Sequence, residues 1–139
     1  MTVLVTDAGF RPDSWDKGFV ALEEAAANTV SLDVASDTDP ADLIPRLAGV
    51  EMVRVDFPSF ADGRGFTIAR QLRLAGYKGR LRAKGHVISD QYAMARRCGF
   101  DEVEIDDDLA ARQPEKDWVF RADWRAHDYQ SRMRARAGS

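Results

Sequence analysis

The chain has 139 residues, of which 45% are hydrophobic and 31% charged, and its formal net charge is −3. These values indicate a single globular domain, residues 1–139, and exclude a disordered chain. The one cysteine, Cys98, excludes an internal disulfide framework and a cysteine-based metal cage within one chain.

The sequence also bears on the cell compartment of the protein and on the classes of partner it binds. No apolar run approaches the roughly 20 residues of a membrane span, and the first residues, MTVLVTDAGF, show no basic leader. Together with the single cysteine, this predicts a cytoplasmic protein with no membrane partner. The chain is acidic overall and lacks a recognised nucleic-acid-binding motif, so no nucleic acid partner is expected.

The charges are unevenly distributed along the chain. Residues 1–63 carry a net charge of −8, residues 64–97 carry +8, and residues 98–139 carry −3. Two interpretations stay open. The charges neutralise one another across the fold, or the basic third creates an anion site by focusing its field on a cleft.

The first 28 residues are poorly legible. Residues 3–5 have the pattern of a short strand, residues 19–27 are partly helical in pattern, and Trp15 is expected to pack against the core. A βα core is expected over residues 29–117. The last part, residues 118–139, mixes aromatic residues with arginines, which is typical either of an interface or of a tail packed on its own domain.

Four strands alternating with helices are predicted within the core. The strands are Thr29–Val34, Met52–Phe57, Arg80–Lys84 and Glu102–Ile105. The helices cover about residues 40–48, shortened by Pro45, about 65–75, ending at Gly76, and about 90–98, capped by Ser89 and ended by Gly99. A weak fourth helix is expected near Leu109. This alternation predicts a parallel sheet built from βα units.

Each strand alternates apolar and charged residues, so one face of the sheet is predicted to be apolar and the other charged. Helices can then cover only the apolar face, and right-handed crossovers on one face place the strands in sequential order. We therefore expect an α/β fold of two layers, a (βα) repeat resembling part of a TIM barrel. The bare face would expose a set of charged residues: Arg54, Asp56, Arg82 and Glu104.

The segment 57–66, FPSFADGRGF, is the densest candidate for chemistry. It follows a strand and opens a helix, at the sheet edge that ligands favour in parallel folds. Glycines allow a close backbone approach, and Arg64 offers a bidentate donor to an oxyanion. The alternative is a structural turn in which Asp62 satisfies backbone donors and Arg64 is solvated.

The segment 82–91, RAKGHVISDQ, is expected at the same edge of the next strand. Arg64 and Arg82 would converge there on a small oxyanion, while Asp62 and Asp90 orient them or cap the helices. His86 is a weak acid/base candidate, and Cys98 is expected to be packed rather than reactive. The predicted anion-binding set is Asp62, Gly63, Arg64, Gly65, Arg82, Asp90 and Gln91.

Several stretches together resemble a known family. They are VDFP at 55–58, F-x-DGRGF at 60–66, AR-x-LR at 69–73, GYKG-x-LRA at 76–83, DQ at 90–91 and RCGFD at 97–101. They resemble an uncharacterised bacterial family described as oxidoreductases involved in sulfite reduction. The resemblance covers residues 50–105 strongly and Tyr129-Gln130 weakly.

The resemblance implies a role beside sulfite reductase and other enzymes of assimilatory sulfate reduction. It supplies no catalytic mechanism and no catalytic residue, and the sequence contains no flavin, nicotinamide or metal-cluster motif, so the cofactor is unknown. Catalysis therefore stays an open question beside an accessory role. An open sheet with a charged face also predicts a homodimer, and a homodimeric interaction module with a structural DGRG motif is the alternative function.

Overall fold

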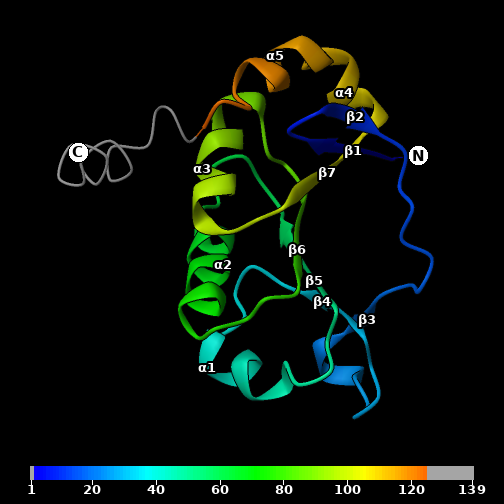
Figure 1. The fold of residues 1–139 in the computed structure, drawn as a ribbon, viewed down its shortest axis with the longest axis vertical. Coiled ribbons are helices and arrows are strands. Elements are labelled where there is room, and N and C mark those ends of the chain that lie inside the picture. Colours follow the sequence, from blue (N-terminus) through cyan, green and yellow to red (C-terminus); the bar gives the residue numbers. More distant parts are fainter. Residues whose placement is uncertain (1, 125–139) are drawn as a thin grey trace, which may run out of the picture.

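Seven strands form one sheet in the computed structural model, which describes residues 2–124 (Figure 1). Their order across the sheet is β2-β1-β7-β6-β5-β4-β3. The bounds are β1 Thr2–Thr6, β2 Gly9–Arg11, β3 Val20–Ala21, β4 Ser31–Val34, β5 Met52–Phe57, β6 Arg80–Gly85 and β7 Glu102–Asp106.

The four predicted strands are confirmed as β4 to β7. They are parallel and adjacent in sequential order, as one-sided crossovers require. β3 adds a parallel pairing at one end, whereas β1 and β2 add antiparallel pairings at the other. The fold is thus the expected two-layer α/β arrangement, extended by a hairpin that the sequence only hinted at in residues 3–5.

Capping residues and prolines account for the bounds of the first helix. α1, Pro40–Leu43, starts after Asp39, whose side chain accepts from Ala41 N, and a 3-10 turn at Ile44–Arg46 follows, as Pro45 predicts. The remaining helices are α2 Arg64–Leu74, α3 Tyr92–Cys98, α4 Asp107–Arg112 and α5 Glu115–Phe120, with short 3-10 turns at Leu22–Glu24 and Ser89–Gln91.

Two helix details differ from expectation. Ser89 does not cap α3, because its hydroxyl donates to Gln113 and its own residue opens the 3-10 turn. The partly helical pattern of residues 19–27 yields only β3 and the 3-10 turn after it. Gly99, by contrast, ends α3 with a φ of 114°, as a C-terminal glycine should.

The core lies between the apolar face of the sheet and the helices α1, α2 and α3, which Figure 1 shows stacked along that face. Side chains of β5 and β6 such as Val53, Val55 and Leu81 are fully buried there, against Ala69 and Leu72 of α2. The apolar half of the predicted alternation is therefore correct.

The opposite face is charged but not bare, which corrects the prediction. Arg82 is 0% exposed, the Glu104 side chain 3% and the Arg54 side chain 14%. Residues 12–19, which we call the strap, cross this face and cover them. Only Asp56 of the four residues expected there is exposed. Trp15 of the strap packs against this polar face rather than against the apolar core.

The last described residues pack on the domain itself. Trp118 of α5 is fully buried, donates to Gln113 O and stacks edge-on against Tyr92. The rest of the predicted C-terminal stretch, including Tyr129-Gln130, lies outside the described residues. Within residues 2–124, no helix is long and apolar enough to cross a membrane.

Candidate functional site

The DGRG segment forms a tight turn between β5 and α2. The Asp62 carboxylate accepts from the backbone N of Arg64 and, through both oxygens, from Nε and Nη2 of the Arg64 side chain, at 3.0 and 2.8 Å. These bonds lower the pKa of Asp62 well below its usual range. The turn thus holds an ionised carboxylate and an arginine in one fixed geometry.

Arg64 remains accessible while it is held. Its side chain is 60% exposed, and its Nη2 also donates to the Ser36 hydroxyl from the loop after β4. Nη1 has no hydrogen-bond partner among residues 2–124. The arginine is therefore oriented at the carboxyl edge of the neighbouring strands β4 and β5.

The loops after β5 and β6 meet, as the sequence predicts. Backbone N of His86 donates to Phe57 O, and the side chain of Gln91 donates to Phe60 O. The rings of Phe60 and His86 lie edge to face with centroids 5.0 Å apart. Asp90 points elsewhere and pairs with Arg121 of the C-terminal part. Gln91 also accepts from Ile88 N, so its role here is to fix the loop.

The expected convergence of Arg64 and Arg82 is wrong. Arg82 lies inside β6, beside Arg54 of β5 and Glu102 of β7, and its guanidinium is occupied on the sheet face by Glu102, Glu104 and Asp13. Residue 82 precedes the end of its strand by three positions, so its side chain meets the flat of the sheet and not the loop edge.

Two glycines at this edge are required by close packing. A Cβ on Gly65 would lie 2.5 Å from the ring of Phe57, and a Cβ on Gly85 would lie 2.8 Å from Phe57 O. Gly85 also has a φ of 109°. Gly63 has neither constraint: a Cβ there would meet only Phe66, at 3.9 Å. Gly65 and Gly85 therefore serve packing between loop and strand, whereas Gly63 does not.

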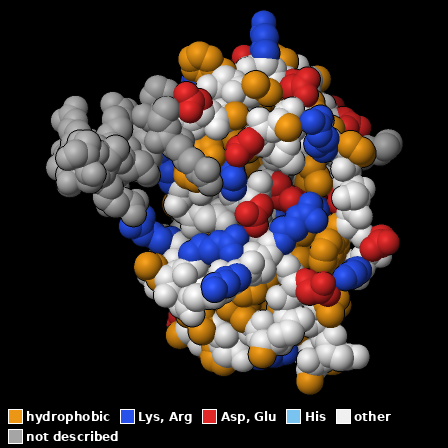
Figure 2. All heavy atoms as spheres, in the orientation of Figure 1, with side chains coloured by type: hydrophobic (Ala, Val, Ile, Leu, Met, Phe, Trp, Pro, Cys, Tyr) orange, Lys and Arg blue, Asp and Glu red, His pale blue; other side chains and the backbone are white. Residues whose placement is uncertain are grey.

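The basic third of the chain is largely neutralised. Figure 2 shows Lys and Arg side chains gathered across the middle of one face with acids among them. Five arginines of residues 64–97 pair with acids from the two acidic thirds: Arg64, Arg73, Arg80, Arg82 and Arg96. The first of the two open interpretations, neutralisation across the fold, describes these five.

One hollow in the described part of the chain is lined largely by basic side chains. It measures about 550 Å³ and is lined by Arg73, Lys78, Arg80 and Arg96 among others. The guanidinium of Arg73 donates hydrogen bonds to the carbonyls of Tyr77, Gly79 and Gly99 and to Asp101. An arginine so occupied has no donor left for a ligand.

We looked for a reactive cysteine and for a group of metal-ligating side chains in residues 2–124. Burial raises the pKa of Cys98, which opposes a reactive thiolate. No group of three or more His, Cys, Asp or Glu side chains in residues 2–124 is placed to hold a metal ion.

The family comparison decides the membership. A family model described as a bacterial protein of unknown function (DUF934) matches residues 31–138. The chain belongs to this family. No curated protein and no solved structure matches it significantly. The match spans β4 to α5 and starts after the strap and the N-terminal hairpin.

Two groups of site residues were missed from the sequence. Ser36 completes the carboxyl edge from the loop after β4, where no motif marks a single serine. Phe60 was part of the candidate segment 57–66 but was given no role of its own. Asp13 completes the polar face. The charged strand positions of that face were legible, since Asp33, Arg54 and Glu104 alternate with apolar residues. Asp13, the partner of Arg82, lies in an irregular segment that carries no periodicity to place it.

Proposed function

We propose that this protein is a cytoplasmic accessory protein of assimilatory sulfate and sulfite reduction that docks a partner enzyme, sulfite reductase or a neighbour in that pathway, at its carboxyl edge. The pathway comes from the resemblance of the family motifs. The observation that carries the docking surface is the pair of Phe60, 40% exposed, and Arg64, both held in place by hydrogen bonds or ring contacts of their loop.

Such a pair suits a binding surface. Aromatic residues and arginines supply much of the binding energy at protein interfaces, and a side chain ordered before binding loses little entropy on complex formation. Hydrogen bonds to Asp62 and Ser36 hold Arg64. The ring of His86 contacts the Phe60 ring, and the Gln91 side chain donates a hydrogen bond to the Phe60 carbonyl. The carboxyl edge therefore presents an oriented cation next to an apolar ring.

The test is a binding titration with purified sulfite reductase. Arg64→Ala and Phe60→Ala should each weaken binding by about tenfold or more. Arg70→Ala, an exposed arginine on the next turn of α2, should bind as the parent does. A parent protein that shows no binding, or three variants that bind equally, would reject the docking surface.

The pathway has its own test. A deletion strain should grow on sulfide and fail to grow, or grow slowly, on sulfate and sulfite. Equal growth on all three would separate the protein from sulfite reduction. The absorption spectrum of the purified protein addresses catalysis, since a bound flavin or haem would favour an oxidoreductase over an accessory protein.

A second candidate is a small oxyanion at Arg64, favoured by its Nη1, which has no hydrogen-bond partner within residues 2–124. Asp62 already balances the charge, so we expect weak binding. Calorimetric titration with sulfite and sulfate should show heat that Arg64→Ala abolishes. If the parent binds neither anion, the DGRG motif is structural at this edge.

We also propose a homodimer, through the C-terminal part rather than a sheet edge. The outer strands β2 and β3 have only three and two residues, which disfavours edge pairing. α5 exposes Phe120 by 75% and Val119 by 43%. Light scattering at micromolar concentration should report twice 15.5 kDa, and Phe120→Ser should shift the mass toward the monomer.

A further inference from the structure

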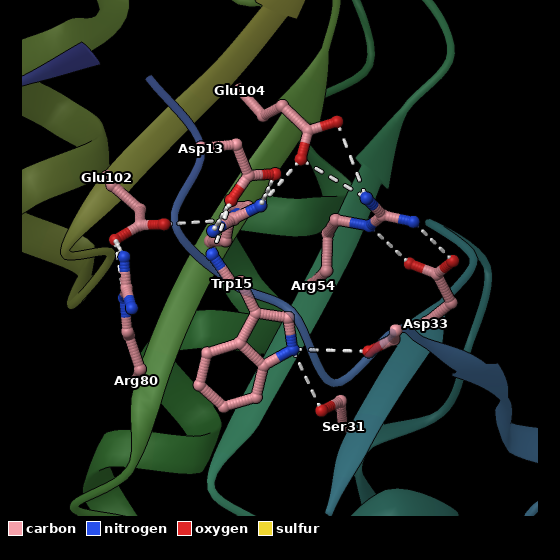
Figure 3. A network of polar contacts seen from close by, with 10 residues as sticks. Asp13, Trp15, Ser31, Asp33, Arg54, Arg80, Glu102 and Glu104 are labelled. Carbon is pink, nitrogen blue, oxygen red and sulfur yellow. Dashed lines mark hydrogen bonds and ion pairs between the residues drawn. The ribbon is translucent and has the colours of Figure 1, made fainter. Parts of the chain in front are cut away.

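We propose a second site, separate from the carboxyl edge: the charged face of the sheet binds a small carboxylate through Arg82, and the strap occupies this site with the carboxylate of Asp13. The ligand takes the place of Asp13 and the strap moves aside. Figure 3 shows Asp13 between Glu102 and Glu104, and its carboxylate accepts hydrogen bonds from Arg82.

The donors of Arg82 define the site. Nε donates to Glu102, at 2.6 Å, and Nη1 donates to Glu104, at 2.8 Å; both acids belong to the neighbouring strand. Asp13 takes what remains, with one oxygen 3.0 Å from Nη1 and the other 3.1 Å from Nη2. This two-oxygen contact is the geometry in which arginine binds a free carboxylate.

The hydrogen-bond donors of this face, rather than its net charge, leave a place for one carboxylate. Three arginines, Arg54, Arg80 and Arg82, face three acids of the sheet, Asp33, Glu102 and Glu104. These are balanced before the strap is counted, yet without Asp13 the fully buried Arg82 would lack a partner for Nη2. Burial raises the pKa of Asp13, but hydrogen bonds and charge from Arg82 outweigh it and lower that pKa overall. The position therefore favours negative charge.

The strap is held by side chains alone. Trp15 donates to Ser31, Lys17 pairs with Glu51 at the surface, and Phe19 lies 3.7 Å over the guanidinium of Arg54. No strap residue takes part in a backbone pairing with the described sheet, and all its residues except Trp15 and Phe19 are exposed. Displacing it breaks few contacts, whereas displacing a strand would break a ladder.

The family match divides the site in the same way. Arg54, Arg82, Glu102 and Glu104 fall within residues 31–138, and the strap precedes them. The floor of the site thus belongs to the matched domain, and its cover is a segment outside the match.

The first experiment is calorimetric titration with acetate at constant ionic strength, set against Asp13→Ala. Because the internal carboxylate competes in the parent, the variant should bind acetate about tenfold or more tightly. Asp16→Ala, an exposed strap residue, is the control and should match the parent. Equal affinity of Asp13→Ala and the parent would overturn the proposal. Sulfite and sulfate are titrated in parallel; tighter binding of either than of acetate would overturn the choice of a carboxylate.

Two further measurements keep the result interpretable. Arg82→Lys in the Asp13→Ala background loses the two-oxygen contact and should weaken acetate binding, while Arg64→Ala should not; the reverse would assign the binding to the carboxyl edge. In the parent, saturating acetate should change the Trp15 fluorescence, identified by its absence in Trp15→Phe. Binding without that change would show that the strap does not move and would contradict the proposal.

Discussion

At the scale of single residues, the family motifs act largely as packing devices. The stretch GYKG-x-LRA and the later RCGFD meet at Arg73, whose guanidinium connects Tyr77, Gly79, Gly99 and Asp101. A substituent on Gly79 would meet the Tyr77 ring, and one on Gly99 would meet Arg73 itself. Two motifs that are separate in the sequence thus meet at the amino edge of β6 and β7. We call the contacts of Arg73 there the joint.

Arg73→Lys should therefore destabilise the fold although the charge is kept. A lysine cannot reach these carbonyls from one planar group, so several half-buried acceptors lose their donor. We expect a cost of about 2–4 kcal/mol in the free energy of unfolding by urea. Arg70→Lys on the same helix should cost under about 0.5 kcal/mol, as exposed substitutions do. Equal effects of the two changes would contradict the joint.

Gly85→Ala tests the approach of loop to strand. Gly76 and Gly85 both have positive φ, of 95° and 109°, but only Gly85 has backbone within contact distance of a Cβ. Gly76→Ala should cost about 1–2 kcal/mol from backbone strain. Gly85→Ala should cost about 1–3 kcal/mol more because Phe57 O must move. Thermal or urea unfolding checks the difference, which vanishes if the contact is unimportant.

The site residues show how far motif-based prediction reaches. Asp62, Arg64 and Gln91 were placed at the correct edge, because a strand followed by a helix start fixes where a loop lies. Arg82 was misplaced since the register along its strand, not its position in the motif, decides which way it points. Asp90 was correctly located near a helix start, but its partner Arg121 comes from the C-terminal part and left no trace in the local pattern.

At the scale of elements, the strands were legible and the N-terminal segment was not. Period-two alternation placed all four central strands within two residues at each end. The same alternation predicted that the polar face of the sheet is exposed. That prediction was wrong, because hydrophobic periodicity gives no information about an irregular segment that covers a face. Residues 12–19 satisfy the face through individual side chains.

Asp7 joins the N-terminal hairpin to α3 and gives a pH prediction. Its carboxylate accepts from Tyr92 Oη and from Nε and Nη2 of Arg96. Burial raises its pKa, but these partners outweigh burial and lower it overall. A carboxyl with a folded pKa below its unfolded value of about 3.9 stabilises the fold above that pH and loses this effect as pH falls.

Asp7→Asn should accordingly be less stable than the parent at pH 7, with a difference that shrinks below about pH 4. Urea unfolding at pH 7, 5 and 3 measures the trend. Asp16→Asn, which changes an exposed acid of the strap, should track the parent at each pH. If the difference in unfolding free energy between Asp7→Asn and the parent were the same at all three pH values, the charge of Asp7 would not be its cause.

At the scale of the whole molecule, one sheet joins the first described residues to the last strand. β1 pairs antiparallel with β7, so that Thr2 lies opposite Asp106 and Val5 opposite Val103. The β7 edge is therefore closed by residues that precede it by roughly a hundred positions. The family match, which starts at residue 31, covers β7 without this closing strand.

This closure dictates an order of events during synthesis. The hairpin of β1 and β2 is synthesised before β7, the strand it pairs with, so we expect it to stay unpaired while β4, β5 and β6 are made. Long-range pairings of this kind form late and slow the final step. Nascent chains arrested before residue 102 should expose the hairpin to protease, and chains extended well past residue 106 should protect it.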